Sequence, residues 1–415
     1  MSGWTDPVGA SVASPADPPD APDASLVTRT ERFRRLDTRR VPSPCFVVDE
    51  VAIEENLRVL NHVQRASGAR ILLALKAFSM FSVAPLVMRY LKGTCASGLH
   101  EARLGREAFG GEVHTFSAAY READLREILR ISDHVVFNSP GQWRRFRALA
   151  REAAATRPRP RFGLRVNPEH SEGEVPLYDP CAPHSRLGMP RAVFPADDLG
   201  DISGLHLHTL CEQNFAPLAR TVAAFEAKFG EFIGQMDWLN LGGGHLITRG
   251  DYDVDALIGL LIRLRDRYRV QLYLEPGEAV VLDSGVLVAE VLDLPWNGMP
   301  LAVLDTSATC HMPDVIEMPY RPRIIDAGAP GAFAQTYRLG GQTCLAGDVI
   351  GDFSFAEPLR IGRRLVFEDM AHYTMVKTTT FNGIALPAIA IWNSETDALR
   401  VVREFDYEDF RGRLS

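Results

Sequence analysis

Three residues able to do covalent and acid–base chemistry each stand at the end of a short apolar run. They are Lys76, His208 and Glu275. A primary amine at the end of a buried strand can have its pKa lowered by burial until it becomes a nucleophile that forms Schiff bases. A nearby carboxylate can hold a proton on a pyridine nitrogen, and an imidazole can stack on such a ring. These residue types therefore indicate Schiff-base chemistry on a pyridoxal ring.

A run of three glycines, Gly242 to Gly244, follows another apolar segment. Without side chains, backbone N–H groups can approach and cradle an anion such as a phosphate. Each feature also has a plainer interpretation: Lys76 as a strand-end lysine reaching solvent, the glycines as a tight turn, and His208 as a core histidine. The combination favours a pyridoxal-phosphate site, and no metal site is predicted.

The elements that must position these residues alternate between short apolar runs and segments of helical periodicity. Eight such alternations within some 235 residues predict a (β/α)₈ barrel of the alanine-racemase type. An open doubly wound sheet is the alternative, but its glycine fingerprint after the first strand is missing. The predicted strands are Ile71–Leu75, Thr94–Ala96, Val113–Phe116, His134–Phe137, Arg161–Val166, Gly204–His208, Trp238–Leu241 and Gln271–Leu274. The predicted helices are Ala52–Arg65, Glu101–Phe109, Glu122–Arg130, Gln142–Ala154, Phe215–Ile233 and Val254–Arg267.

The rest of the chain divides into segments of different composition. Residues 1–26 are rich in Pro, Ala, Asp and Ser and predict a disordered leader; 27–48 join a β domain, 49–282 form the barrel, and 283–415 form a mostly β domain. Strands are predicted there at Val286–Leu294, Leu301–Leu304, Thr336–Leu339, Leu365–Glu368 and Ala388–Trp392. The Pro- and Gly-rich segment from Thr306 to Tyr337 is expected to be a long ordered loop.

Charge and composition restrict the partners. A net charge of -8 argues against nucleic acid or an anionic membrane as the main partner and fits a cationic small molecule. The six cysteines are scattered without paired spacing, and no signal peptide or apolar run of membrane-spanning length occurs. The expected location is the cytoplasm.

At these residues the sequence resembles the fold-type III pyridoxal-phosphate decarboxylases, which include the ornithine and diaminopimelate decarboxylases, and most closely the carboxynorspermidine decarboxylase branch. The resemblance covers roughly residues 42–395 and implies a homodimer with active sites at the interface. The strings that carry it are Leu75-Lys76-Ala77-Phe78, Gly204 to Glu212, Leu241 to His245, Glu275-Pro276-Gly277-Glu278, Thr309 to Asp314, Gly340 to Cys344 and His372-Tyr373-Thr374.

The resemblance implies a role for each matching residue. Lys76 becomes the Schiff-base lysine, His208 the ring-stacking residue and Glu275 the partner of the pyridine nitrogen. The remaining cofactor contacts are Gly243, Gly244 and Tyr373 at the phosphate, together with Arg165 at a strand end. Cys344 would reach across the dimer interface and protonate the carbanion after carbon dioxide leaves.

Two departures bear on the substrate. Glu278 stands where ornithine and diaminopimelate decarboxylases typically have arginine, which argues for a polyamine-like tail; Gln342 stands where the family most often has proline. The expected reaction converts carboxynorspermidine or carboxyspermidine to norspermidine or spermidine. The acidic candidates for binding the tail are Glu212, Glu278, Asp305, Asp314, Asp348, Glu317 and Asp179.

Three alternatives stay open. The first is another basic amino-acid decarboxylase of the same fold, of the ornithine or diaminopimelate type. The second is a non-catalytic cofactor-binding regulator, although retention of Lys76 and Cys344 favours an active enzyme. The third is a racemase, which would use Tyr373 as a second base.

Overall fold

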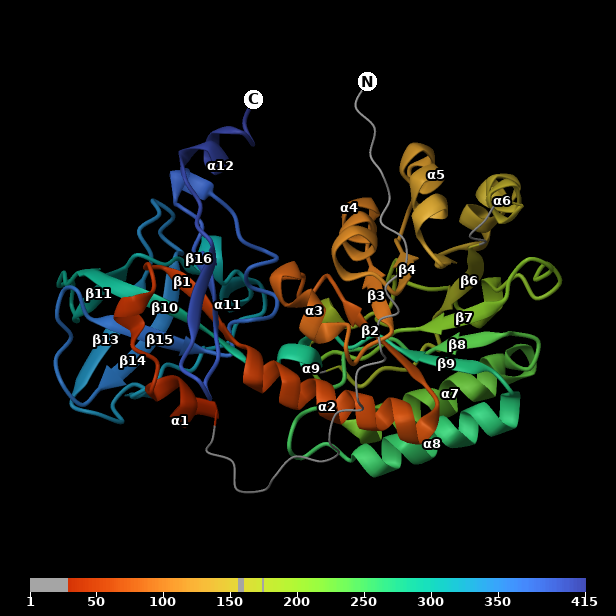
Figure 1. Ribbon diagram of the computed structural model, residues 1–415, viewed down its shortest axis with the longest axis horizontal. Helices are drawn as coiled ribbons and strands as arrows, with labels where there is room; N and C mark the ends of the chain where they lie inside the picture. The colour runs from red at the N-terminus through yellow and green to blue at the C-terminus, as the bar shows by residue number, and fades with distance from the viewer. Residues whose placement is uncertain (1–28, 156–159, 174) are drawn as a thin grey trace, which may run out of the picture.

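The computed structural model describes residues 29–155, 160–173 and 175–415, so the predicted leader lies outside the described residues. The chain forms a closed barrel of parallel strands beside a separate, mostly β part (Figure 1). The barrel strands confirm the predicted barrel; they are β2 (Arg70–Ala74), β3 (Gly93–Ala96), β4 (Glu112–Phe116), β5 (His134–Phe137), β6 (Arg161–Val166), β7 (Gly204–Leu207), β8 (Trp238–Asn240) and β9 (Gln271–Leu274).

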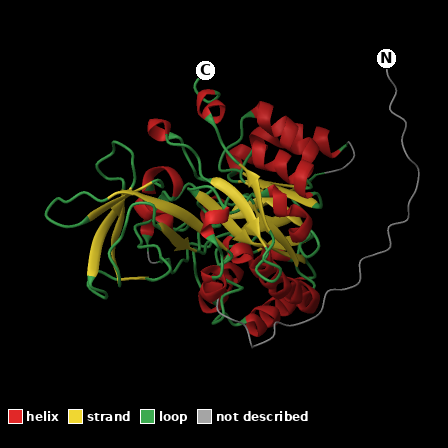
Figure 2. Ribbon diagram, turned by 60° about the vertical axis from the view of Figure 1, so that its left-hand side comes forward, coloured by secondary structure: helices red, strands yellow, loops and turns green. Residues whose placement is uncertain are grey.

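Helices surround the barrel on its outer face, with strands inside (Figure 2). They are α2 (Glu50–Ser67), α3 (Ala84–Val87), α4 (Leu99–Leu104) with a π-helical turn at Gly105–Phe109, α5 (Glu122–Ile131), α6 (Pro140–Ala154), α7 (Phe215–Ile233), α8 (Val254–Tyr268) and α9 (Glu278–Val281). The side chains of Asp49, Ser139 and Asp253 accept N–H bonds at the starts of α2, α6 and α8. Such caps satisfy backbone donors that a helix start leaves free.

The barrel interior is filled at its amino-terminal end by aromatic rings. Trp238 is fully buried, and a Cβ atom at Gly163 or Gly204 would lie 2.3 or 2.0 Å from its indole. These glycines therefore make room for a large ring inside the closed sheet. His114 and His134 stack there with ring centroids 3.9 Å apart.

The second part is a nine-stranded sheet in the order β12-β14-β13-β11-β10-β1-β16-β17, with β15 also paired to β10. Its strands are β1 (Cys45–Asp49), β10 (Gly285–Asp293), β11 (Leu301–Leu304), β12 (Ala327–Gly328), β13 (Gln335–Gly340), β14 (Val349–Phe355), β15 (Arg364–Glu368), β16 (Ala388–Trp392) and β17 (Leu399–Arg403). β1 runs antiparallel to β10 and parallel to β16, so the start of the described chain completes a sheet built mainly by its end.

Two expectations for this region need correction. The segment from Thr306 to Tyr337 is not a plain loop, because it contains α10 (Ala308–His311), α11 (Asp314–Glu317) and the short strand β12. Ser307 starts α10 by accepting a hydrogen bond from the Cys310 N–H at 3.1 Å. The sequence also did not predict β14 or β17, whose glycine, aspartate and arginine residues weaken the apolar strand pattern.

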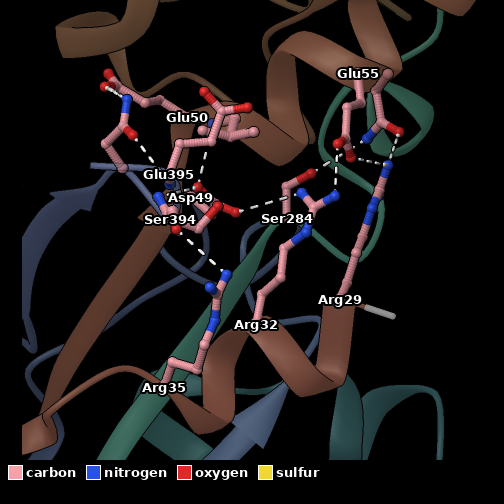
Figure 3. A network of polar contacts seen from close by, with 12 residues as sticks. Arg29, Arg32, Arg35, Asp49, Glu50, Glu55, Ser284, Ser394 and Glu395 are labelled. Carbon is pink, nitrogen blue, oxygen red and sulfur yellow. Dashed lines mark hydrogen bonds and ion pairs between the residues drawn. The ribbon is translucent and has the colours of Figure 1, made fainter. Parts of the chain in front are cut away.

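Helix α1 (Arg29–Arg34) connects the two parts (Figure 3). Arg32 lies 2.6 Å from Glu55 on α2 and 3.9 Å from Asp49, where β1 becomes α2. Arg35, just after α1, donates to the carbonyl oxygen of Ser394 at 3.3 Å. Because Arg32 and Asp49 are both buried, this network holds the barrel against the sheet with charges shielded from water. Among the described residues, no helix is long and apolar enough to span a membrane.

Candidate active site

A cavity of ≈ 610 Å³ opens at the carboxyl ends of the barrel strands. This is the end at which barrel enzymes place their active sites. The cavity brings together most of the residues singled out in the sequence: Lys76, Arg165, His208, Gly244, Glu275, Glu278, Glu212, Asp314, Asp179 and Tyr373.

Lys76 lies two residues after β2, in a turn where the Ala77 N–H donates to the Ala74 carbonyl oxygen at 3.2 Å. Its side chain is exposed to the cavity, yet the surrounding walls enclose it. This enclosure, assisted by the positive charge of Arg165, lowers the pKa of the Lys76 amine. A lowered pKa increases the unprotonated fraction, which is the form that attacks a carbonyl carbon.

Glu275 follows β9 and is 8% exposed. Its carboxylate accepts a hydrogen bond from Asn240 Nδ2 at 2.7 Å and lies 3.3 Å from His206 Nε2. Burial alone would raise the pKa of Glu275, but the facing His206 and Asn240 reverse this and lower it to about 2. Glu275 therefore stays ionised and can face a protonated ring nitrogen.

His208 follows β7 and has a fixed ring orientation. Its Nδ1 accepts a hydrogen bond from the Gly243 N–H at 3.2 Å, and Arg165 Nη2 donates to its carbonyl oxygen at 2.8 Å. Burial, reinforced by Lys76 and Arg165, lowers the pKa of His208. The ring is thus neutral, and its proton lies on Nε2 because Nδ1 accepts.

The glycine turn has a structural reason beyond anion binding. Gly244 has φ +83, and a Cβ atom there would lie 1.9 Å from the Leu210 carbonyl oxygen. At Gly243 a Cβ atom would lie 2.1 Å from the Glu275 carbonyl oxygen. The Gly243 N–H is directed at His208, whereas the Gly244 N–H finds no acceptor among the described residues and remains available to an anion.

Five predicted site residues do not line the cavity: Gly243 and Glu317, which adjoin lining residues, and Cys344, Asp348 and Asp305 on the sheet part. Cys344 is exposed on the sheet part, and its N–H donates to Asn382 Oδ1 at 2.9 Å. Asp348 is buried and accepts hydrogen bonds from Ser307, Thr309 and Thr343, so it connects loops of its own sheet. Asp305 accepts the Glu290 N–H at 2.8 Å and also lies away from the cavity. The departure Gln342 packs here, with Nε2 donating to the Asp305 carbonyl oxygen at 3.3 Å.

Several residues near the site were not assigned roles from the sequence. His206 and Asn240 each stand two residues before a predicted site residue, so they share its inward face of the strand. Because every second residue of a strand faces the same side, stepping back two residues from His208 and from Gly242 would have pointed to both. Lys377 contacts Asp314 and Glu317 at the cavity mouth, a pairing between distant segments that has no local sequence signal.

An enclosed amine, an ionised carboxylate, a neutral imidazole and an open glycine N–H together fit pyridoxal phosphate. The arrangement defines the class of pyridoxal-phosphate enzymes built on a barrel with a second sheet domain. Residues 45–371 match the family described as "Pyridoxal-dependent decarboxylase, C-terminal sheet domain". The chain belongs to this family of pyridoxal-dependent decarboxylases.

Comparison with individual relatives shows which decarboxylases of this family the chain is similar to. The carboxyaminopropylagmatine decarboxylase of Synechocystis is 43% identical over 376 residues, which cover 90% of this chain and 96% of the relative. The carboxynorspermidine/carboxyspermidine decarboxylase of Campylobacter jejuni is 42% identical, over 89% of this chain and 98% of the relative. A crystal structure of carboxynorspermidine decarboxylase from Campylobacter jejuni, complexed with norspermidine, superposes with a TM-score of 0.82 at 41% identity, covering 90% of this chain and 100% of that chain.

Proposed function

We propose that this protein decarboxylates carboxynorspermidine or carboxyspermidine to norspermidine or spermidine, as a step of polyamine biosynthesis. The observation that carries the proposal is the cavity in which Lys76, His208 and Glu275 face one space bordered by carboxylates. Relatives named for these substrates support it, at 42% and 38% identity over nearly the whole chain.

We assign each residue a role that its contacts allow. Lys76 would hold the cofactor through its amine, Glu275 would keep the pyridine nitrogen protonated, and the neutral His208 imidazole would pack against the cofactor. Gly244 and Tyr373 contact the phosphate; the Tyr373 N–H donates to the Ala77 carbonyl oxygen at 2.9 Å, which ties it to the Lys76 turn. Pyridoxal phosphate held by these residues would supply an electron sink for the pair released when the substrate carboxylate leaves as carbon dioxide.

The carbon that loses the carboxylate must then take up a proton. We propose that Cys344 of a second copy donates it, which requires a homodimer, because this chain's own Cys344 lies outside its cavity. We also place the protein in the cytoplasm, in keeping with its free cysteines in the described residues.

The Synechocystis relative suggests a second candidate substrate for this protein, because the substrate in its name ends in a guanidinium group. Its identity of 43% is close to the 42% and 38% of the two relatives named for triamine acids, so both tails belong in one test. Ornithine- or diaminopimelate-type activity is disfavoured by Glu278, and a regulator would not need the enclosed amine of Lys76. A racemase is disfavoured because burial raises the pKa of Tyr373, so little phenolate is present near neutral pH to act as a second base.

The test is a substrate panel with product identification by mass. Purified holoenzyme receives carboxynorspermidine, carboxyspermidine, carboxyaminopropylagmatine, ornithine and diaminopimelate at equal concentration. We expect the highest kcat/KM for one of the two triamine acids. Preference for ornithine or diaminopimelate would refute the proposal, and preference for the agmatine derivative would move it to the second candidate.

The Lys76→Ala variant separates cofactor attachment from folding. We expect it to lose both activity and the visible absorbance of lysine-bound pyridoxal phosphate while keeping wild-type circular dichroism. An unchanged absorbance spectrum would show that another residue holds the cofactor.

A further inference from the structure

Two carboxylates of the cavity wall, Glu212 and Glu278, stand where two cavities meet. A second cavity of ≈ 370 Å³ adjoins the larger one and shares with it Glu212, Glu278, Asp314, Met318 and Tyr373. Glu278 opens α9 directly after Gly277, and Glu212 follows His208 by four residues with φ +52. A tail leaving the Lys76 region toward the second cavity must pass these two side chains.

The other acidic side chains of the larger cavity already have protein partners. Glu275 accepts from Asn240 at 2.7 Å, Asp314 is paired with Lys377, and Asp179 accepts the Cys181 N–H at 2.7 Å. Glu212 and Glu278 accept no hydrogen bond from any described residue. The Glu278 side chain is 14% exposed, and that exposure is to the cavity.

Within the part of the chain that the structure describes, the one cation paired with Glu278 is shared with a second carboxylate. His372 Nε2 lies 3.8 Å from Glu278 Oε1 but 3.2 Å from Asp369 Oδ1, and neither ring nitrogen of His372 makes a hydrogen bond to any residue that the structure describes. The second cavity is also lined by three arginines: Arg249 pairs with Asp251 at 2.5 Å, Arg323 pairs with Asp283 at 2.6 Å, and Arg321 lies over the Phe353 ring, 5.6 Å from its centroid.

The local charges therefore do not balance. The carboxylates of Glu212, Glu278 and Asp369 face one imidazolium, that of His372. Burial, with further contributions from Glu212 and Asp369, raises the pKa of Glu278 to about 7, although His372 opposes the shift. Burial also raises the pKa of Glu212. Enclosed carboxylates without a full set of cations are costly, and a cationic ligand between them relieves that cost.

We propose that Glu212 and Glu278 together bind the secondary ammonium of the substrate tail. This assignment rests on the proposed function. Carboxynorspermidine, carboxyspermidine and carboxyaminopropylagmatine all carry a secondary amine two methylenes beyond the α-carbon, and they differ only beyond it. Ornithine and diaminopimelate carry a methylene at that position, so they have no charge there, and the ammonium of ornithine comes one atom further along. The terminal cation would then extend into the second cavity.

The test compares two ligands that differ only at this nitrogen. Norspermidine and its analogue with a methylene in place of the secondary amine are titrated into holoenzyme by calorimetry. The two amino acids whose decarboxylation would give these amines are compared as substrates by kcat/KM. Glu278→Gln and Glu212→Gln should each weaken the amine ligand by about tenfold or more, as expected for a charge-assisted contact, and change the analogue little.

Glu317→Gln is the matched control, because this carboxylate lies near the same mouth but is held by Lys377. Glu317→Gln should leave the ratio of the dissociation constants of the two ligands unchanged. Loss of both ligands by the same factor in the Glu212 and Glu278 variants would overturn the assignment, as would a wild-type enzyme that binds both ligands equally. Failure of the wild type to decarboxylate carboxynorspermidine would instead refute the proposed function, because the binding comparison does not depend on turnover.

Discussion

The stacked histidines at the closed end of the barrel make acid stability a quantitative test of the core. His134 is 4% exposed and lies 3.9 Å from His114 and 4.6 Å from Trp238 by ring centroids, and its Nδ1 has no hydrogen-bond partner among the described residues. Burial, followed by the nearby His114 and Arg161, lowers the pKa of His134 far below its usual range. The folded protein therefore keeps this ring neutral throughout mildly acidic conditions.

The pH dependence of stability has a definite sign, because proton binding to His134 is coupled to unfolding. An unfolded chain protonates His134 near its ordinary pKa of about 6.5, whereas the folded protein does not. The free energy of unfolding contributed by this residue is therefore present above about pH 6.5 and falls as the pH drops below it. For one proton, the loss between about pH 7 and pH 4.5 is about 2.5 kcal/mol.

His134→Phe removes the titrating group and keeps an aromatic ring in the stack. Urea unfolding of both proteins, followed by tryptophan fluorescence at several pH values, should show the variant gaining about 2.5 kcal/mol relative to wild type across that interval. Other buried histidines, such as His206 and His208, titrate alike in both proteins and cancel in the difference. Parallel stability curves would refute the argument.

A bound metal would give a different result. Glu112, His114 and His134 place possible ligand atoms within 4.8 Å of one another. If a chelator destabilises the wild type and leaves His134→Phe unaffected, the two rings hold a metal ion rather than form a simple stack. We expect no effect of the chelator on either protein.

Three further predictions concern single contacts. Asn240→Ala removes a charge-assisted hydrogen bond, so the pKa of Glu275 should rise by about 1 to 2 units and move the acid limb of the pH–kcat profile upward. The pKa of His372 is raised to about 9, because the carboxylates facing it outweigh its burial. Its contribution to the free energy of unfolding is therefore complete below about pH 6.5 and is lost as the pH rises through 9. His372→Gln should flatten this alkaline loss of stability, measured by thermal unfolding. Arg32→Ala removes the ion pairs with Glu55 and with buried Asp49, which should cost about 3–5 kcal/mol in urea unfolding, and a loss below 1 kcal/mol would contradict the role of these pairs in joining the two parts.

The barrel could be predicted because each of its strands is a short apolar run that ends at a polar or small residue. β14 and β17 escaped prediction because their sequences mix apolar residues with glycine, aspartate and arginine. Among site residues, those at strand ends were predictable from order along the chain. The structural roles of Asp348 and Asp305 could not be predicted. In the sequence, a carboxylate that accepts hydrogen bonds from neighbouring loops of a sheet looks the same as one that binds a ligand.

Glu275 and Glu278 give the physical reason for that limit. They stand three residues apart, and burial raises the pKa of both. Asn240 and His206 reverse the effect for Glu275 and lower its pKa to about 2, whereas His372 only partly offsets it for Glu278, whose pKa reaches about 7. The fold thus supplies the partners of the carboxylate that must stay charged and leaves the other to a ligand. A cation that binds beside Glu278 must lower its pKa, so binding near neutral pH should release a proton and strengthen as the pH rises through about 7.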